Sequence, residues 1–360
     1  MLERFVEKTC FTSQEDFVNN LKIKAPENFN FGYDVVDAWA KEEPNKRAIC
    51  WTNDKGEHID FSYADLKEKT DKTAAYFQSL GIGKGDMVML ILKRRIEFWF
   101  SIIALHKLGA VVIPATHLLT KKDIVYRCNA ADIKMIVCAG EEVITKHIVE
   151  AMPDSPTVQH LISIGPDMPE GFKDFQEGLA QAVPFVKPEF PNTNDDISLM
   201  YFTSGTTGEP KMVAHDFTYP LGHITTGSFW HNLHENSLHL TIADTGWGKA
   251  VWGKLYGQWL CEAATFVYDF DRFDAADILP MFAKHQITTF CAPPTMLRMM
   301  VKEDISRFDL SSIQHASTTG EALNPEVFRR FEEATGLRIA EGSGQTDGGG
   351  RTSGAALCSV

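Results

Sequence analysis

Short apolar runs alternate with longer amphipathic stretches over the first part of the chain, a pattern typical of a layered α/β fold. Residues 63–80 carry apolar side chains at helical spacing and run into a glycine-rich turn, so they predict a helix. Residues 87–92 and 110–114 are almost entirely apolar, which predicts buried strands. Between them, residues 97–108 have a helical pattern that ends at Gly109. Because strand, helix and strand follow one another, we expect a mostly parallel sheet.

A second α/β unit follows a stretch that is rich in proline. Residues 153–191 have few long apolar runs, so we place a boundary near residue 190. The predicted organisation is a first subdomain at 1–190, a second at 191–347 and a flexible tail of small and polar residues at 348–360. The other predicted strands are 134–138, 197–202, 238–242, 264–268 and 288–292, and the other predicted helices are 274–285, 294–302 and 325–334.

The net charge excludes some classes of partner. A formal charge of −13 over 360 residues leaves no general basic field for nucleic acid or an anionic membrane. The most apolar stretch, residues 98–114, is interrupted by His106 and Lys107 and is too short to be an integral membrane segment. The seven cysteines show no C-x-x-C spacing, which fits a reducing compartment and argues against zinc. We therefore expect a soluble cytoplasmic protein.

A glycine-punctuated loop follows the predicted strand at 197–202. Its candidate phosphate-binding residues are Thr203, Ser204, Gly205, Thr206, Thr207, Gly208 and Lys211. Glycines let the backbone approach an anion closely, hydroxyl and N–H groups donate to phosphate oxygens, and lysine supplies positive charge. A Walker A loop requires G-K-[ST], whereas Lys211 follows Pro210 here. A loop of this composition is also typical of a plain surface turn, so a short match leaves both interpretations open.

The full loop resembles the signature of the adenylate-forming superfamily, which includes acyl-CoA synthetases, luciferases and peptide-synthetase adenylation domains. Further stretches resemble the same family in the same order, namely residues 61–66, 108–114, 243–247, 292–295, 319–323 and 341–346. Residues 244–259 look most like the medium-chain acyl-CoA synthetases. The resemblance implies the large N-terminal domain of that fold, with layered α/β subdomains and mostly parallel sheets. It also implies that a carboxylic acid is joined to AMP, with release of pyrophosphate, and then to coenzyme A.

The resemblance further implies roles for individual residues. The loop holds the β- and γ-phosphates of ATP, and the candidate catalytic residues are Lys211 and Thr346, with Thr346 at the α-phosphate. The residues that enclose adenine are Gly320, Glu321, Ala322, Glu341, Gly342, Ser343, Gly344 and Gln345. Asp347 stands where the family has a glutamate that serves Mg²⁺, and it keeps a hard oxygen ligand on a shorter side chain. ATP, Mg²⁺ and coenzyme A are the expected cofactors and co-substrates.

Four residues of the medium-chain-like stretch are implied to line the slot for the acid: Trp247, Gly248, Trp252 and Gly253. On the residues alone, tryptophans at this density are equally typical of core packing. Gly344 stands where acetate-specific relatives have a tryptophan, which implies an acid longer than acetate. We therefore expect a small-molecule partner that is a medium-chain or short-branched carboxylic acid.

The sequence departs from the family near its C-terminus. Ser343 replaces a residue that is usually aromatic, and the glycine-rich run after Asp347 has no counterpart. Since family members continue into a mobile C-terminal domain, we expect a fragment that binds ATP weakly, makes little acyl-CoA and self-associates, including as a homo-oligomer. Two alternatives stay open: a non-catalytic nucleotide- or acyl-binding remnant, and an adenylating enzyme with another acceptor. The match at residues 247–259 disfavours another acceptor.

Overall fold

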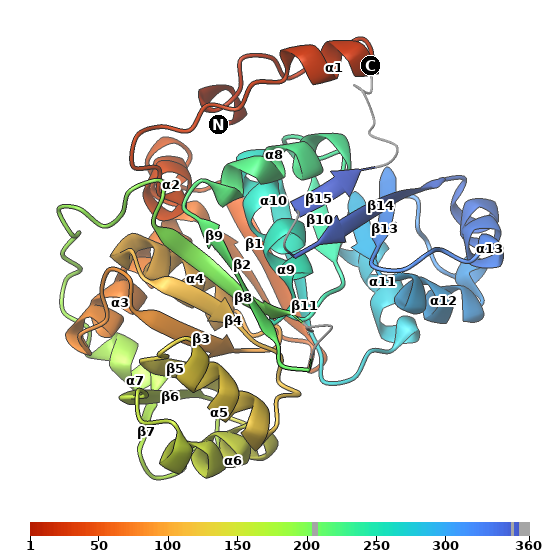
Figure 1. Ribbon diagram of the computed structural model, residues 1–360. Helices are drawn as coiled ribbons and strands as arrows, with labels where there is room; N and C mark the ends of the chain where they lie inside the picture. Colours follow the sequence, from red (N-terminus) through yellow and green to blue (C-terminus); the bar gives the residue numbers. More distant parts are fainter. Residues whose placement is uncertain (204–207, 347–348, 353–360) are drawn as a thin grey trace.

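Two large β-sheets organise the computed structural model, which describes residues 1–203, 208–346 and 349–352 (Figure 1). The seven-stranded sheet has the order β7 (Phe172–Asp174), β6 (His160–Ile164), β5 (Met135–Ala139), β3 (Met87–Ile91), β4 (Val111–Pro114), β8 (Ile197–Thr203) and β9 (Lys211–Asp216). The eight-stranded sheet has the order β15 (Gly349–Thr352), β14 (Ile339–Gln345), β13 (His315–Thr319), β12 (Thr289–Ala292), β10 (Leu238–Thr241), β11 (Ala264–Asp269), β1 (Arg47–Asn53) and β2 (His58–Ser62).

Parallel pairing fills the interior of both sheets, and antiparallel pairing is confined to their edges. Within the seven-stranded sheet only the β8–β9 hairpin is antiparallel. In the eight-stranded sheet the antiparallel pairs are β1–β2 and β14–β15, one at each edge. The predicted α/β fold with mostly parallel sheets is therefore confirmed. The carboxyl ends of the inner strands share one edge of each sheet, which is where α/β folds place their ligands.

Each sheet contains strands from both sides of the boundary expected at residue 190. The β8–β9 hairpin comes after that point but completes the sheet of the first half, next to β4. Conversely, β1 and β2 come from the first half but belong to the sheet of the second, because β1 pairs with β11 in the register Ile49 opposite Thr265. Proline-rich composition marks a loop, but it carries no information on which strands pair across it.

The largest core cluster lies on one face of each sheet and includes the helices α3 (Tyr63–Ser79), α4 (Glu97–Leu108), α8 (Tyr219–Phe229), α9 (Gly248–Lys254) and α10 (Tyr256–Leu260). In β3, Val88 and Leu90 belong to this cluster, whereas Met89 and Ile91 belong to another cluster on the opposite face. Strand side chains alternate in this way because their period is two residues. Burial on both faces explains why the predicted strands have uninterrupted apolar runs.

Outer helices cover the remaining faces of the sheets (Figure 1). The seven-stranded sheet is covered by α5 (Lys121–Ala130) and α6 (Glu142–Ala151), and the eight-stranded sheet by α11 (Ala275–His285), α12 (Pro294–Lys302) and α13 (Pro325–Thr335). The other helical segments are η1 (Leu2–Arg4), α1 (Gln14–Asn20), η2 (Gly32–Asp37), α2 (Ala38–Glu42), η3 (Met152–Asp154), α7 (Phe175–Ala180) and η4 (Ile305–Arg307). No helix in the described part of the chain is long and apolar enough to cross a bilayer.

Local signals set the ends of α3 and α4. Ser62 and Asp65 form a capping box at the start of α3, where two otherwise unpaired backbone N–H groups find side-chain acceptors. Gly109 ends α4 with φ of 72°. A Cβ there would lie 1.8 Å from the Pro191 carbonyl oxygen, so only glycine allows the approach.

The expectation of a flexible tail needs correction. Residues 349–352 form β15, paired with β14, so the flexible tail predicted from residue 348 is wrong for these four residues, and 353–360 lie outside the described residues. Pairing of this kind uses backbone groups, so small side chains do not prevent it. Cys50, Cys128, Cys138, Cys261 and Cys291 are buried free thiols.

Candidate functional site

A cavity of about 460 Å³ opens where the carboxyl ends of strands from both sheets come together. Residues that follow β3, β4, β10, β11, β12, β13 and β14 contribute to its wall, and the N-terminal part of α9 forms one side. The apolar part of the lining is Leu118, Ile242, Trp247, Trp252, Phe270, Pro293 and Met296. A largely apolar cleft with a few polar groups is the usual form of a small-molecule site.

Three of the four residues expected to hold the acid line this cavity. Trp247 is 62% exposed at its mouth, and Gly248 and Trp252 lie one helical turn apart on α9. A Cβ on Gly248 would lie 3.7 Å from Oγ1 of Thr346. The acid slot predicted from the sequence and the predicted α-phosphate contact are therefore neighbours.

Gly253 does not line this cavity. It is buried against β10, where a Cβ would lie 2.7 Å from Cγ2 of Thr241. Residue 253 follows residue 248 by five positions, which places it about 140° further round the helix. Its small size serves the close packing of α9 on β10, and the expectation that it lines the acid slot is wrong.

The two segments predicted to enclose adenine come together around a second cavity of about 300 Å³. Its lining consists of Gly320, Glu321, Ala322, Glu341, Gly342, Ser343 and Gly344. They meet because β13 and β14 are adjacent parallel strands, with Thr319 opposite Gly342. Gly320 and Gly344 line both cavities, so the two spaces adjoin.

Several residues of these segments also have structural roles. Oε1 of Glu341 accepts from the backbone N–H of Leu323 at 3.0 Å. The carboxylate of Glu321 accepts from the backbone N–H of Thr295 at 3.2 Å. A Cβ on Gly342 would lie 2.7 Å from Cε2 of Trp230, so Gly342 packs against that indole ring. These contacts fix the backbone around the second cavity.

The predicted phosphate loop lies in the β8–β9 hairpin. Thr203 and Lys211 are opposite each other in the ladder, and Lys211 is exposed. Gly208 has φ of 113°, a conformation that favours glycine. Ser204, Gly205, Thr206 and Thr207 lie outside the described residues. Because β8 runs parallel to β4, its carboxyl end is at the same sheet edge as Thr116 and the larger cavity.

Thr346 lies at the junction of these parts. It lines the larger cavity, next to Gly248 of α9. Burial lowers the pKa of His215, whose ring stacks on Tyr219 at 3.9 Å. Gln345, the residue before Thr346, ends β14. Asp347 lies outside the described residues, so the magnesium assignment stays a prediction.

A buried arginine at the cavity was missed by the sequence analysis. The guanidinium of Arg94 lies over the Phe270 ring at 3.9 Å, and its Nη1 is 3.6 Å from Oδ2 of Asp244. Nδ1 of His117 is 3.1 Å from the same carboxylate oxygen. Burial lowers the pKa of Arg94. Arg94 and His117, with the Asp244 carboxylate that both face, form a charged and polar patch in a largely apolar cavity.

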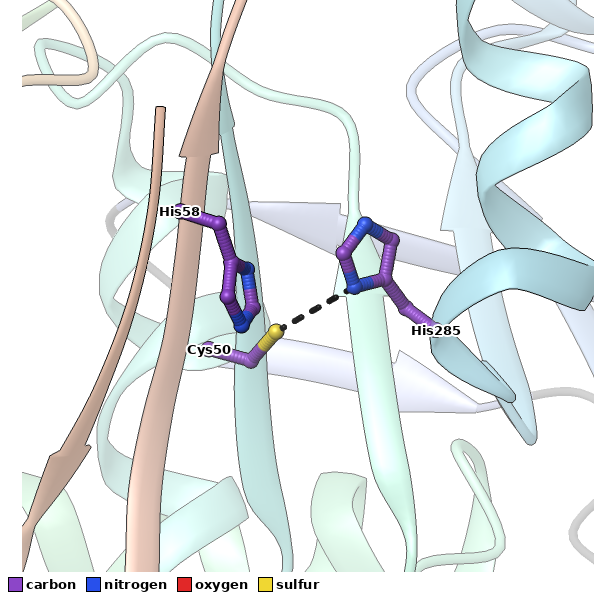
Figure 2. Close-up of side chains that lie close together, drawn as sticks. All are labelled: Cys50, His58 and His285. Atoms are coloured by element: carbon purple, nitrogen blue, oxygen red, sulfur yellow. Dashed lines mark hydrogen bonds between the residues drawn. The ribbon is translucent and has the colours of Figure 1, made fainter. Parts of the chain in front are cut away.

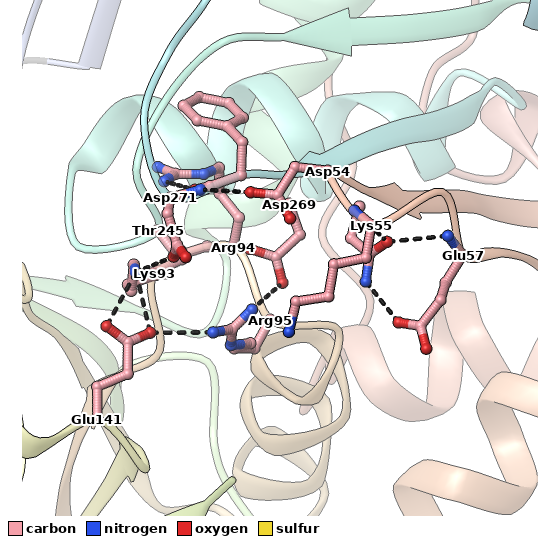
Figure 3. Close-up of polar contacts among 12 residues, drawn as sticks. Asp54, Lys55, Glu57, Lys93, Arg94, Arg95, Glu141, Thr245, Asp269 and Asp271 are labelled. Atoms are coloured by element: carbon pink, nitrogen blue, oxygen red, sulfur yellow. Dashed lines mark hydrogen bonds and ion pairs between the residues drawn. The ribbon is translucent and has the colours of Figure 1, made fainter. Parts of the chain in front are cut away.

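The neighbours of Arg94 join the two sheets (Figure 3). Nζ of Lys93 is 2.9 Å from Glu141 and 2.7 Å from Asp271, while Arg95 contacts both Glu141 and Asp269 at 2.9 Å. These residues follow β3, β5 and β11, so the network fixes the strand ends that surround the cavity. The signal in the sequence was a run of three basic residues directly after a predicted buried strand.

Lys249 is a second cation that sequence reasoning missed. Its side chain lines the larger cavity, and its Nζ is buried without a hydrogen-bond partner among the described residues. Burial lowers the pKa of this amine. A buried donor without a partner costs free energy, which a polar group on a ligand can recover.

Comparison with known proteins agrees with this architecture. Residues 36–357 match the family of AMP-binding enzymes. The chain is 36% identical over 339 residues to human acyl-coenzyme A synthetase ACSM4, mitochondrial, covering 92% of this chain and 58% of the relative. It is 35% identical over 329 residues to mouse acyl-coenzyme A synthetase ACSM5, mitochondrial, covering 89% and 56%. The chain thus spans little more than half the length of these relatives.

Solved structures show the same fold. An acyl-CoA synthetase from Brucella canis superposes with a TM-score of 0.80 at 23% identity, over 89% of this chain and 58% of that one. The anthranilate CoA ligase AuaEII, in complex with anthranoyl-AMP, superposes with a TM-score of 0.82 at 23% identity, over 89% and 61%. The fold, the adjoining cavities and the sequence match lead to one conclusion: the chain belongs to the AMP-binding enzyme family.

Proposed function

We propose that this chain carries the ATP- and acid-binding site of an acyl-CoA synthetase that acts on medium-chain or short-branched carboxylic acids. The observation that carries the proposal is the junction of two cavities at Gly320 and Gly344. One is largely apolar and suits an acyl chain, and the other is lined by flat glycine-rich backbone that suits an adenine ring. Thr346 lies where the acid and the nucleotide would meet.

The proposed chemistry has two steps. A carboxylate oxygen of the acid attacks the α-phosphorus of ATP, which forms the acyl-adenylate and releases pyrophosphate. The sulfur of coenzyme A then attacks the acyl carbon, the thiol loses its proton, and AMP leaves. No general base is needed in the first step, because the acid is already ionised near neutral pH. The first step instead requires two anions to be held together by positioned donors and cations.

Residues of this chain fit that requirement. The hairpin loop that we assign to the β- and γ-phosphates begins at Thr203, which offers a hydroxyl, and ends at Lys211. Thr346 is assigned to the α-phosphate. Arg94, held against Phe270, supplies positive charge at the cavity that would receive the acid. When bound, Mg²⁺ would shield the charge of the phosphates.

The size and lining of the cavity support an acid longer than acetate. Gly344 lines it without a side chain, and the cavity, of about 460 Å³, is also lined by Trp247 and Trp252. Each methylene moved from water into an apolar site contributes about 0.8 kcal/mol, or about a fourfold gain in affinity. Affinity for straight-chain acids should therefore rise with length until the cavity is filled.

Isothermal titration calorimetry with acids of two to ten carbons, with and without ATP, tests binding. ATP–pyrophosphate exchange with the same acids tests the first chemical step. We expect the best acid to be longer than acetate, and Gly344→Trp should move the preference towards acetate. A clear preference of the unaltered chain for acetate or an amino acid would exclude the proposed substrate class. Binding of ATP and acid without exchange would favour a non-catalytic binding role.

A further inference from the structure

Three potential metal ligands that line neither cavity lie together on the outer face of the eight-stranded sheet (Figure 2). Cys50 is on β1, His58 is on the edge strand β2, and His285 is the last residue of α11. One ligand atom from each lies within 4.8 Å of the other two. Sγ of Cys50 is 3.8 Å from Nδ1 of His285.

Strand register brings the first two ligands to one face. Cys50 is opposite Asp60, and His58 precedes Asp60 by two residues, so all three side chains point towards the helix layer. Cys50 belongs to the core cluster formed with α11, whose C-terminal end carries His285. Three elements therefore converge on one point, and none of them contributes two ligands with a fixed sequence spacing.

The atoms are close to the geometry that zinc requires. Zn–S and Zn–N bonds of about 2.3 and 2.0–2.1 Å at tetrahedral angles place ligand atoms roughly 3.3–3.6 Å apart. The Cys50–His285 distance of 3.8 Å is already near this value. His58 is exposed, so rotation of its side chain can move its ring nitrogen by about 1 Å and close the remaining gap. The arrangement needs no movement of the strands.

Metal binding would also couple to protonation. A thiolate and neutral imidazoles are the forms that bind a transition metal, so binding would release the Cys50 proton and the affinity would depend on pH. Asp60 lies 3.7 Å from Nε2 of His58 and can orient it.

We propose that Cys50, His58 and His285 bind a divalent transition metal of the zinc class, with water or Asp60 in the fourth position. One thiolate and two imidazoles form a borderline-soft ligand set that suits zinc or cobalt better than magnesium. The metal would link the β1–β2 hairpin to α11. The absence of C-x-x-C spacing argued against zinc at the level of sequence, but ligands gathered from three separate elements leave no such spacing.

Calorimetry with Zn²⁺, and the visible spectrum with Co²⁺ substituted for it, test the site in the whole chain. We expect one metal per chain, a sulfur-to-cobalt charge-transfer band, and release of a proton that varies with pH. His58→Ala should weaken binding at least 100-fold without unfolding the protein, because this side chain is exposed. Cys50→Ser should remove the charge-transfer band. His234→Ala, at an exposed histidine outside the cluster, is the matched control and should change neither result.

Two outcomes would overturn the proposal: no stoichiometric binding of Zn²⁺ or Co²⁺, or binding that is unchanged in both His58→Ala and Cys50→Ser. The test is independent of the proposed ligase activity. None of the three ligands lines either cavity of the candidate site. Loss of metal binding in the variants with intact binding of ATP and acid would therefore separate the two proposals.

Discussion

Gly248→Val should shorten the acid that this chain accepts. A Cβ at Gly248 would be 3.7 Å from Oγ1 of Thr346 and 3.9 Å from Nε1 of Trp252, so the first added carbon fits in ordinary contact. The two further carbons of valine must enter the cavity. Gly248 is the first residue of α9 and is not among the glycines with positive φ, so the backbone accepts a side chain.

The expected loss of acid affinity follows from the part of the cavity that the valine side chain fills. If the valine side chain displaces two to three methylenes of the ligand, at about 0.8 kcal/mol each, the loss is about 2 kcal/mol, or about 30-fold in affinity. An acid of eight carbons should lose this much, whereas an acid of three carbons, which does not reach the position, should lose little. Calorimetric dissociation constants for the two acids measure the difference directly.

The control is Gly222→Val in α8. A Cβ at Gly222 meets nothing within 4 Å, and the residue is exposed, so neither acid should be affected. Equal weakening of the long and the short acid by Gly248→Val would mean that the substitution distorts the site. No weakening of either would mean that the acid binds elsewhere. Either result would refute the assignment of this cavity to the acyl chain.

Three further substitutions test single cations. Lys211→Ala should weaken ATP binding in calorimetry with an unchanged unfolding midpoint, because an exposed lysine contributes little to stability; unchanged affinity would remove the loop from the site. Lys249→Met removes a buried, unpartnered amine, so urea unfolding should show a gain of about 1–3 kcal/mol; a loss would indicate that the amine has a partner. Burial lowers the pKa of Lys254 from 10.5 to about 7. Burying the charged amine therefore destabilises the fold to the full extent below pH 7, and this cost is absent above pH 10.5, where the amine is neutral in both the folded and the unfolded state. Stability of the unaltered chain should therefore rise across that window by on the order of 5 kcal/mol relative to Lys254→Met, and parallel pH profiles would contradict this.

Local patterns predicted elements well, because the signals that form them are local. The helix at α3 and the strands β3 and β4 match the predicted segments within one or two residues. The mostly parallel arrangement followed from the order of elements. By contrast, nothing in the composition of β1 or β8 specifies a partner strand, and both pair outside their own half of the chain. Pairing of this kind is decided by tertiary packing, which a single sequence does not display.

The residues of the candidate site also fall into two groups, those that the sequence could predict and those that it could not. The segments predicted to enclose adenine and three of the four residues predicted to line the acid slot were named from family resemblance, and the structure brings them to two adjoining cavities. Gly253 could have been rejected from helical geometry alone, since it lies on another face of the helix from Gly248. Arg94 and Lys249 were missed because their significance depends on burial, and a charged residue in a sequence gives no sign that its charge will be buried.

The exchange of strands between the two sheets sets the order in which the chain can fold during synthesis. Strand β1 cannot pair with β11 until roughly 200 more residues have been made, which at 5–20 residues per second takes roughly 10–40 s. Throughout that time the β1–β2 hairpin has an open edge and apolar side chains that no sheet yet covers. Ile49 and Trp51, buried in the finished core, are then exposed to other chains. The free edge of β1 is therefore open to pairing with other chains until β11 has been made.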